Sequence, residues 1–113
     1  MSYDVTLLVG YGEYPFYYDH PRDETTDHSI EEAGEDLGLS AELVRELWVW
    51  DDEFQQTYNP IDGRRSAFPA AEAERSWVER GRGLAERVGR ESAVIARIEY
   101  RGFGGVAPGT CVF

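Results

Sequence analysis

Lysine is absent from this 113-residue sequence, and all eleven of its cationic side chains are arginine. Without lysine, the chain offers neither a Schiff-base residue nor the lysine of a P-loop. The single cysteine, Cys111, cannot form an internal disulfide, which predicts a reducing, cytoplasmic location. No apolar run is long enough to cross a membrane, and the first residues lack the basic start of a signal peptide.

Positive charge is scarce in the first half of the chain. Residues 1–62 contain sixteen acidic side chains and two arginines, a net charge of −14, whereas residues 63–113 carry +3. Direct binding to nucleic acid or to an anionic membrane is therefore not expected, because phosphate contacts depend on arginine and lysine. An acidic half of this kind favours a basic protein partner, and solubility alone is the alternative explanation.

Alternating polarity predicts the strands. Residues 4–11 place Val5, Leu7 and Val9 on one face, and residues 93–101 alternate in the same way. A short second strand is expected within residues 16–19. A glycine-rich loop and a last short strand are expected within residues 102–113.

Apolar residues at helical spacing predict the helices. Ser29 and Glu32 have capping-box spacing, which predicts a short helix that ends near Gly38. Ser40 is expected to cap a longer helix, and Pro69 to be the first residue of another. The buried stripe of the longer helix is predicted to comprise Leu43, Val44, Leu47, Trp48, Trp50 and Phe54. We therefore predict one α+β domain over residues 1–113, with a small antiparallel or mixed sheet covered by two long helices in two layers.

A resemblance covers about the last two-thirds of the chain. The segment LWVWDDEFQQTYNPIDGRRSAFPAAEAERSWVERGRGLAERV, followed by IEYR, resembles a group of small proteins common in actinobacteria. Those proteins have a Trp-rich helix, a Phe-Pro start, a Glu/Arg helix and an amphipathic strand. The resemblance implies the same order of elements and a cytoplasmic protein, and it implies no catalytic residue.

Catalytic and metal sites have weak support in the sequence. His20 and His28 are the natural metal ligands, with aspartates nearby, but their spacing matches no zinc motif. We expect no cofactor and no enzymatic activity, because two histidines and one cysteine leave few ways to assemble a hydrolytic triad. Asp51 and Asp52 are adjacent, and helical neighbours point in different directions, so they are not expected to act as a pair.

The acidic residues that follow Phe16 are the stronger candidates for function. Two tyrosines run directly into them, and a tyrosine beside carboxylates suits an interface with a basic protein. Tyr17 or Tyr18 is predicted to anchor such an interface. The predicted partner-binding residues are Tyr17, Tyr18, Asp19, Asp23, Glu24, Asp27, Glu31, Glu32, Glu35 and Asp36.

Three hypotheses follow from the sequence. The leading one is a non-enzymatic module that covers a basic surface, in its most concrete form an immunity protein or antitoxin-like inhibitor of a toxin or nuclease. The second is a metal-dependent enzyme or regulator that uses His20, His28 and nearby carboxylates. The third is a small ligand-binding or scaffold domain, for which the sequence specifies no ligand.

Overall fold

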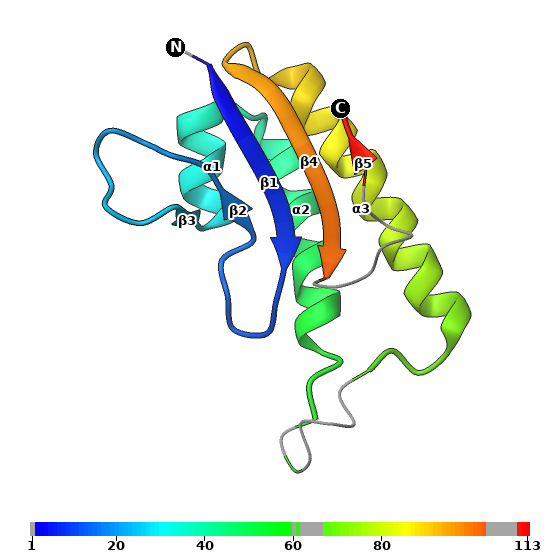
Figure 1. The fold of residues 1–113 in the computed structure, drawn as a ribbon. Coiled ribbons are helices and arrows are strands. Elements are labelled where there is room, and N and C mark those ends of the chain that lie inside the picture. The colour runs from blue at the N-terminus through cyan, green and yellow to red at the C-terminus, as the bar shows by residue number, and fades with distance from the viewer. Residues whose placement is uncertain (1, 60, 62–66, 104–110) are drawn as a thin grey trace.

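The computed structural model describes residues 2–59, 61, 67–103 and 111–113, and its elements are shown in Figure 1. Strands and helices are grouped along the chain, so the fold is α+β. In chain order the elements are β1 (Tyr3–Val9), β2 (Phe16–Tyr17), β3 (Asp27–His28), α1 (Ile30–Leu37), α2 (Ala41–Gln55), α3 (Ala71–Glu91), β4 (Ile95–Phe103) and β5 (Cys111–Val112). The glycine-rich loop predicted before β5 falls largely on residues 104–110, outside the described residues.

The described strands form one mixed sheet in the order β3-β2-β1-β4-β5. β1 pairs in parallel with β4, and the other neighbouring strands are antiparallel. A parallel pair needs a crossover connection, and here the three helices provide it. The predicted α+β class and the mixed sheet are confirmed.

The core lies between the sheet and the helices, which are behind the sheet in the view of Figure 1. Val5, Leu7 and Val9 of β1 are at most 2% exposed, as their alternation predicted. Ile98 and Tyr100 extend this inner face onto β4. The buried faces of all three helices belong to the same apolar cluster, so α1 shares the cover with the two longer helices.

Helices α2 and α3 are joined by a reciprocal pair of tryptophans. The Trp50 and Trp77 rings stack with centroids 4.3 Å apart. The indole Nε1 of Trp50 donates to the backbone oxygen of Trp77 at 2.9 Å, and the Nε1 of Trp77 donates to that of Trp50 at 2.7 Å. Gly81 allows this approach, because a Cβ there would overlap the Trp50 ring and the Tyr100 hydroxyl. We call this contact the tryptophan seam.

Two predictions about the helices are wrong in detail. Helix α3 begins at Ala71 and not at Pro69, because Ala70 is the N-cap and has an extended backbone with φ −151°. Trp48 was predicted to widen the buried stripe of α2, yet it is 45% exposed. One residue along a helix is a rotation of about 100°, which turns Trp48 away from the core that its neighbour Leu47 enters.

Candidate protein-binding surface

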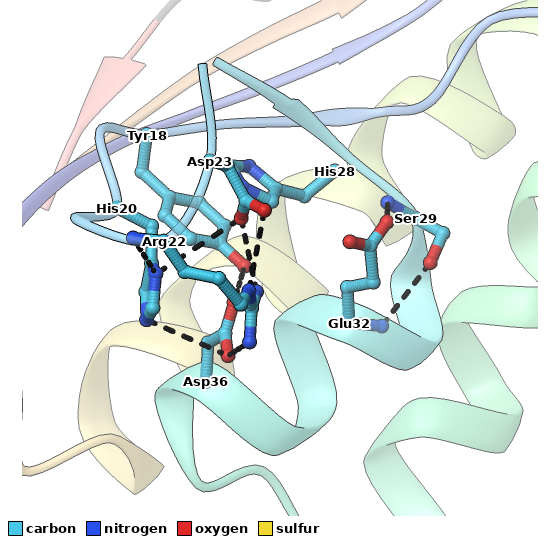
Figure 2. A network of polar contacts seen from close by, with 8 residues as sticks. All are labelled: Tyr18, His20, Arg22, Asp23, His28, Ser29, Glu32 and Asp36. Atoms are coloured by element: carbon cyan, nitrogen blue, oxygen red, sulfur yellow. Dashed lines mark hydrogen bonds and ion pairs between the residues drawn. The ribbon is translucent and has the colours of Figure 1, made fainter. Parts of the chain in front are cut away.

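The predicted acidic residues lie on three consecutive segments at the β3 edge of the sheet. These segments are the loop of residues 18–26 between β2 and β3, the strand β3 itself, and α1 (Figure 1). Helix α1 starts where predicted: the Ser29 hydroxyl accepts from the backbone N–H of Glu32 at 3.1 Å, and the Glu32 carboxylate accepts from the backbone N–H of Ser29 at 3.1 Å. Figure 2 shows this capping box beside the polar contacts that join the loop to α1.

Tyr18 joins the start of the loop to α1 from inside. Its hydroxyl donates to Asp36 Oδ2 at 2.7 Å, and its ring stacks on His28 with centroids 3.8 Å apart. Burial and the hydrogen bond to Asp36 both raise the pKa of Tyr18. Tyr18 is only 3% exposed and offers little of its ring to a partner, so the prediction that Tyr17 or Tyr18 anchors an interface now depends on Tyr17. Tyr17, the other predicted anchor, is half-buried.

Arg22 is the cation that holds the loop and α1 together (Figure 2). Its Nη2 donates to Asp36 Oδ2 at 3.0 Å and to Asp23 Oδ2 at 2.9 Å, and its Nε donates to Asp23 Oδ1 at 3.2 Å. The guanidinium lowers the pKa of Asp23 to about 2. Burial alone would raise the pKa of Asp36, but the bonds from Tyr18 and Arg22 outweigh it and lower that pKa. Two of the eight predicted acids thus already have a cation.

Both histidines lie in the same network. His28 is 1% exposed, and its Nε2 lies 3.0 Å from Asp23 Oδ2. The Nδ1 of His28 has no hydrogen-bond partner within the described part of the chain. His20 is nearer the surface, where its Nδ1 accepts from the backbone N–H of Arg22 at 3.1 Å and its Nε2 lies 3.8 Å from Asp36 Oδ1.

A metal ion would need the place that Arg22 occupies. Asp23, His28 and Asp36 each have a ligand atom within 4.8 Å of the others, which is the spacing of a coordination shell. The Arg22 guanidinium, however, contacts both carboxylates and supplies the positive charge between them. A cation at this point would have to displace Arg22, so the donor set is better suited to fastening the loop. We call Tyr18, His20, Arg22, Asp23, His28 and Asp36 the loop clamp.

Of the six remaining predicted acids, five are exposed. Glu32 is half-buried because it closes the capping box. The other five are exposed, and no hydrogen bond or ion pair joins any of them to another side chain in residues 2–59, 61, 67–103 and 111–113. They lie in the loop, on β3 and on α1, segments that the loop clamp holds side by side. We call these five residues the acidic edge: Asp19, Glu24, Asp27, Glu31 and Glu35.

The comparison with protein families decides the class of this protein. A family model described as Serratia CdiI immunity protein-like matches residues 3–102, which include the loop, all three helices, β1 and all of β4 except Phe103. The chain belongs to this family. No curated protein matches the sequence.

Membership makes this chain an immunity protein, for which a toxin is the implied partner. Immunity proteins act by binding, which agrees with the prediction that the chain is not an enzyme.

The described helices include none that is long and apolar enough to span a membrane. The adjacent carboxylates of α2 have different surroundings, since Asp51 is buried and Asp52 is exposed.

Proposed function

We propose that this immunity protein inhibits its toxin by covering a basic surface of the toxin with the acidic edge, and that it acts in the cytoplasm. The observation that carries the proposal is the difference between two groups of the predicted acids. Arg22 neutralises Asp23 and Asp36, while the five acids of the acidic edge remain exposed without a cationic partner among the described residues.

Electrostatics gives this arrangement a definite effect on binding. Uncompensated carboxylates on neighbouring segments raise the rate of encounter with a cationic surface, and the effect weakens as salt screens the charges. The loop clamp also reduces the entropic cost of association, because a loop that is already ordered does not have to be ordered on binding. The proposed toxin surface is basic, as in a nuclease that attracts phosphate.

The test compares two variants of equal net charge. The edge variant carries Asp19→Asn, Glu24→Gln, Glu31→Gln and Glu35→Gln, which leave the loop clamp intact. The control variant changes four exposed acids of α2 and α3: Glu42→Gln, Glu72→Gln, Glu79→Gln and Glu86→Gln. Stopped-flow association with the cognate toxin is measured from low to high salt. We expect association of the edge variant to slow at least tenfold at low salt and to lose most of its salt dependence.

The control variant should retain the association rate and the salt dependence of the unmodified protein within about twofold, since its charges lie on other elements. If the two variants slow equally, net charge and not the acidic edge governs the encounter, and the proposal is wrong. It is equally wrong if neither variant changes the rate.

A further inference from the structure

One side chain of α2, Gln55, binds the backbone of the loop between β1 and β2 at two positions. Gln55 donates from Nε2 to the backbone oxygen of Gly10 at 3.0 Å, and its Oε1 accepts from the backbone N–H of Gly12 at 3.0 Å. Gly12 has φ +68°, a conformation that suits glycine. A Cβ on Gly10 would overlap the Glu13 carboxylate, so the Glu13 side chain folds back over that glycine. Glu13 and Tyr14 are therefore presented from a fastened turn.

A first hollow lies on the β2–β3 side of Tyr14. It encloses about 310 Å³ and is lined by Gly12, Glu13, Tyr14, Tyr17, Thr26 and Asp27. Asp27 is the cross-strand partner of Tyr17 in the β2–β3 pair, which places their side chains on the same face. Burial, Glu13 and Asp27 together raise the pKa of Tyr17, so both carboxylates act on the same ring. Neither carboxylate has an arginine partner in the described part of the molecule.

A second hollow lies on the helical side of Tyr14. It encloses about 240 Å³ between the turn, the start of α1 and the outer face of α2. Tyr14 and Trp48, which are 53% and 45% exposed, line it together with Pro15 and Ile30. Exposed tryptophan and tyrosine beside a pocket are the composition of an interface hot spot, because their large rigid rings bury much surface at little entropic cost.

We propose that these two hollows form the anchor of the toxin interface: an arginine or lysine side chain of the toxin enters the first, between Glu13 and Asp27, and an apolar side chain enters the second, between Tyr14 and Trp48. This inference rests on the proposed function, because it takes the toxin to be basic. It adds the residues that determine how long the complex lasts, whereas the acidic edge determines how fast it forms, and Asp27 belongs to both sets.

The groove between α2 and α3 is a weaker candidate although it is larger, at about 550 Å³. Arginines and glutamates alternate along it, and Arg80 pairs with Glu53 while Arg87 pairs with Glu46. These four charges compensate one another, and the other arginines that line the groove, Arg45 and Arg90, disfavour the cation that a basic toxin would bring. The first hollow differs because its carboxylates are uncompensated, which favours a partner that brings the cation.

A small probe tests the first hollow without the toxin. N-acetyl-L-arginine amide is titrated into the protein while ¹H–¹⁵N and aromatic resonances are recorded, with N-acetyl-L-glutamine amide as the neutral control. We expect saturable shifts at residues 12–17, 26 and 27 with the arginine probe alone. A Glu13→Gln/Asp27→Asn variant should lose at least half of the shift. Equal shifts in that variant, or shifts confined to α1, would overturn the assignment of this hollow.

Dissociation of the toxin complex tests both hollows. Tyr14→Ala and Trp48→Ala should each raise the dissociation constant about 30-fold or more, mainly through faster dissociation. Val49→Ala is the matched control, because Val49 adjoins Trp48, is 55% exposed and lines the α2–α3 groove instead. It should change the constant less than twofold. Circular dichroism confirms that each variant is folded.

The outcome separates this inference from the proposed function. If the Tyr14 and Trp48 variants bind like the unmodified protein while the edge variant associates slowly, the anchor is wrong and the acidic edge stands. If the hollow variants dissociate rapidly and the edge variant associates normally, the anchor stands on its own and the acidic edge is wrong. If all of these variants bind normally, both are wrong.

Discussion

The tryptophan seam and the loop clamp join parts of the same molecule with opposite kinds of contact. The seam is a stacked pair of buried indoles whose two N–H groups are satisfied by backbone oxygens. The clamp is a set of ionisable side chains around Arg22, which is itself exposed. Apolar contact should make the first insensitive to pH and salt, whereas the second should depend on both. A charge count in the sequence does not distinguish acids that hold the fold from acids that are free to bind.

Breaking the tryptophan seam should lower the stability of the fold more than any other change proposed here. Trp77→Ala removes a side chain with no exposed surface and leaves a cavity against Trp50, so we expect the free energy of unfolding to fall by about 3–5 kcal/mol. Urea denaturation followed by circular dichroism measures this. Trp48→Ala is the control, and its cost should stay below about 1 kcal/mol because that ring is 45% exposed. Equal losses would contradict the packing described here.

Breaking the loop clamp at Asp36 should lower stability by a smaller amount. Asp36→Ala leaves the Tyr18 hydroxyl and the Arg22 guanidinium without their shared acceptor, so we expect a loss of about 2–3 kcal/mol at pH 7. Glu35→Ala removes an adjacent acid that is exposed, and it should change stability by less than about 0.5 kcal/mol. Urea denaturation of both variants makes the comparison. A similar loss in both would mean that Asp36 is one more surface charge.

The pH dependence of stability also distinguishes the loop clamp from the tryptophan seam, and we expect it to be the smallest of these effects. Because Arg22 lowers the folded-state pKa of Asp23 from 3.8 to about 2, the ionised carboxylate stabilises the fold above pH 3.8. That contribution is lost as the pH falls through the folded-state pKa. Arg22→Gln raises this pKa, so the decline in stability between pH 3.8 and about 2 should become shallower.

The midpoint of urea denaturation, measured at pH 7, 4, 3 and 2.5, follows this loss of stability in acid. Arg45→Gln is the control, because Arg45 is an exposed arginine of α2 with no ion-pair partner in the described residues. Its decline with acid should match that of the unmodified protein. An unchanged acid profile in Arg22→Gln would show that Asp23 is not held by Arg22.

Much of the fold could be predicted because it depends on neighbours in sequence. Period-two alternation identified β1 and β4, and the Ser29–Glu32 spacing identified the start of α1. The parallel pairing of β1 with β4 could not be predicted, since it joins residues about ninety positions apart and no local pattern encodes it. The family comparison agrees with the prediction of an immunity protein, which rested on charge and on the lack of a catalytic set.

The candidate site was only partly predictable for the same reason. Asp36 meets Tyr18 and Arg22 from eighteen and fourteen residues away, so the sequence could not show that Asp36 and Asp23 serve the loop clamp. Tyr14 and Trp48 were missed as surface residues because each adjoins apolar residues that are buried. The one available signal was the position of Trp48 next to Leu47, off the four-residue repeat of the α2 stripe.

The position of β1 in the middle of the sheet has a consequence for synthesis. Its parallel partner is β4, so the central pair cannot form until residues 95–103 have left the ribosome. The loop of residues 18–26 and α1 leave the ribosome well before β4. The sheet against which they pack is incomplete until β4 has paired with β1. The sheet that supports the acidic edge is therefore completed only after nearly the whole chain has been synthesised.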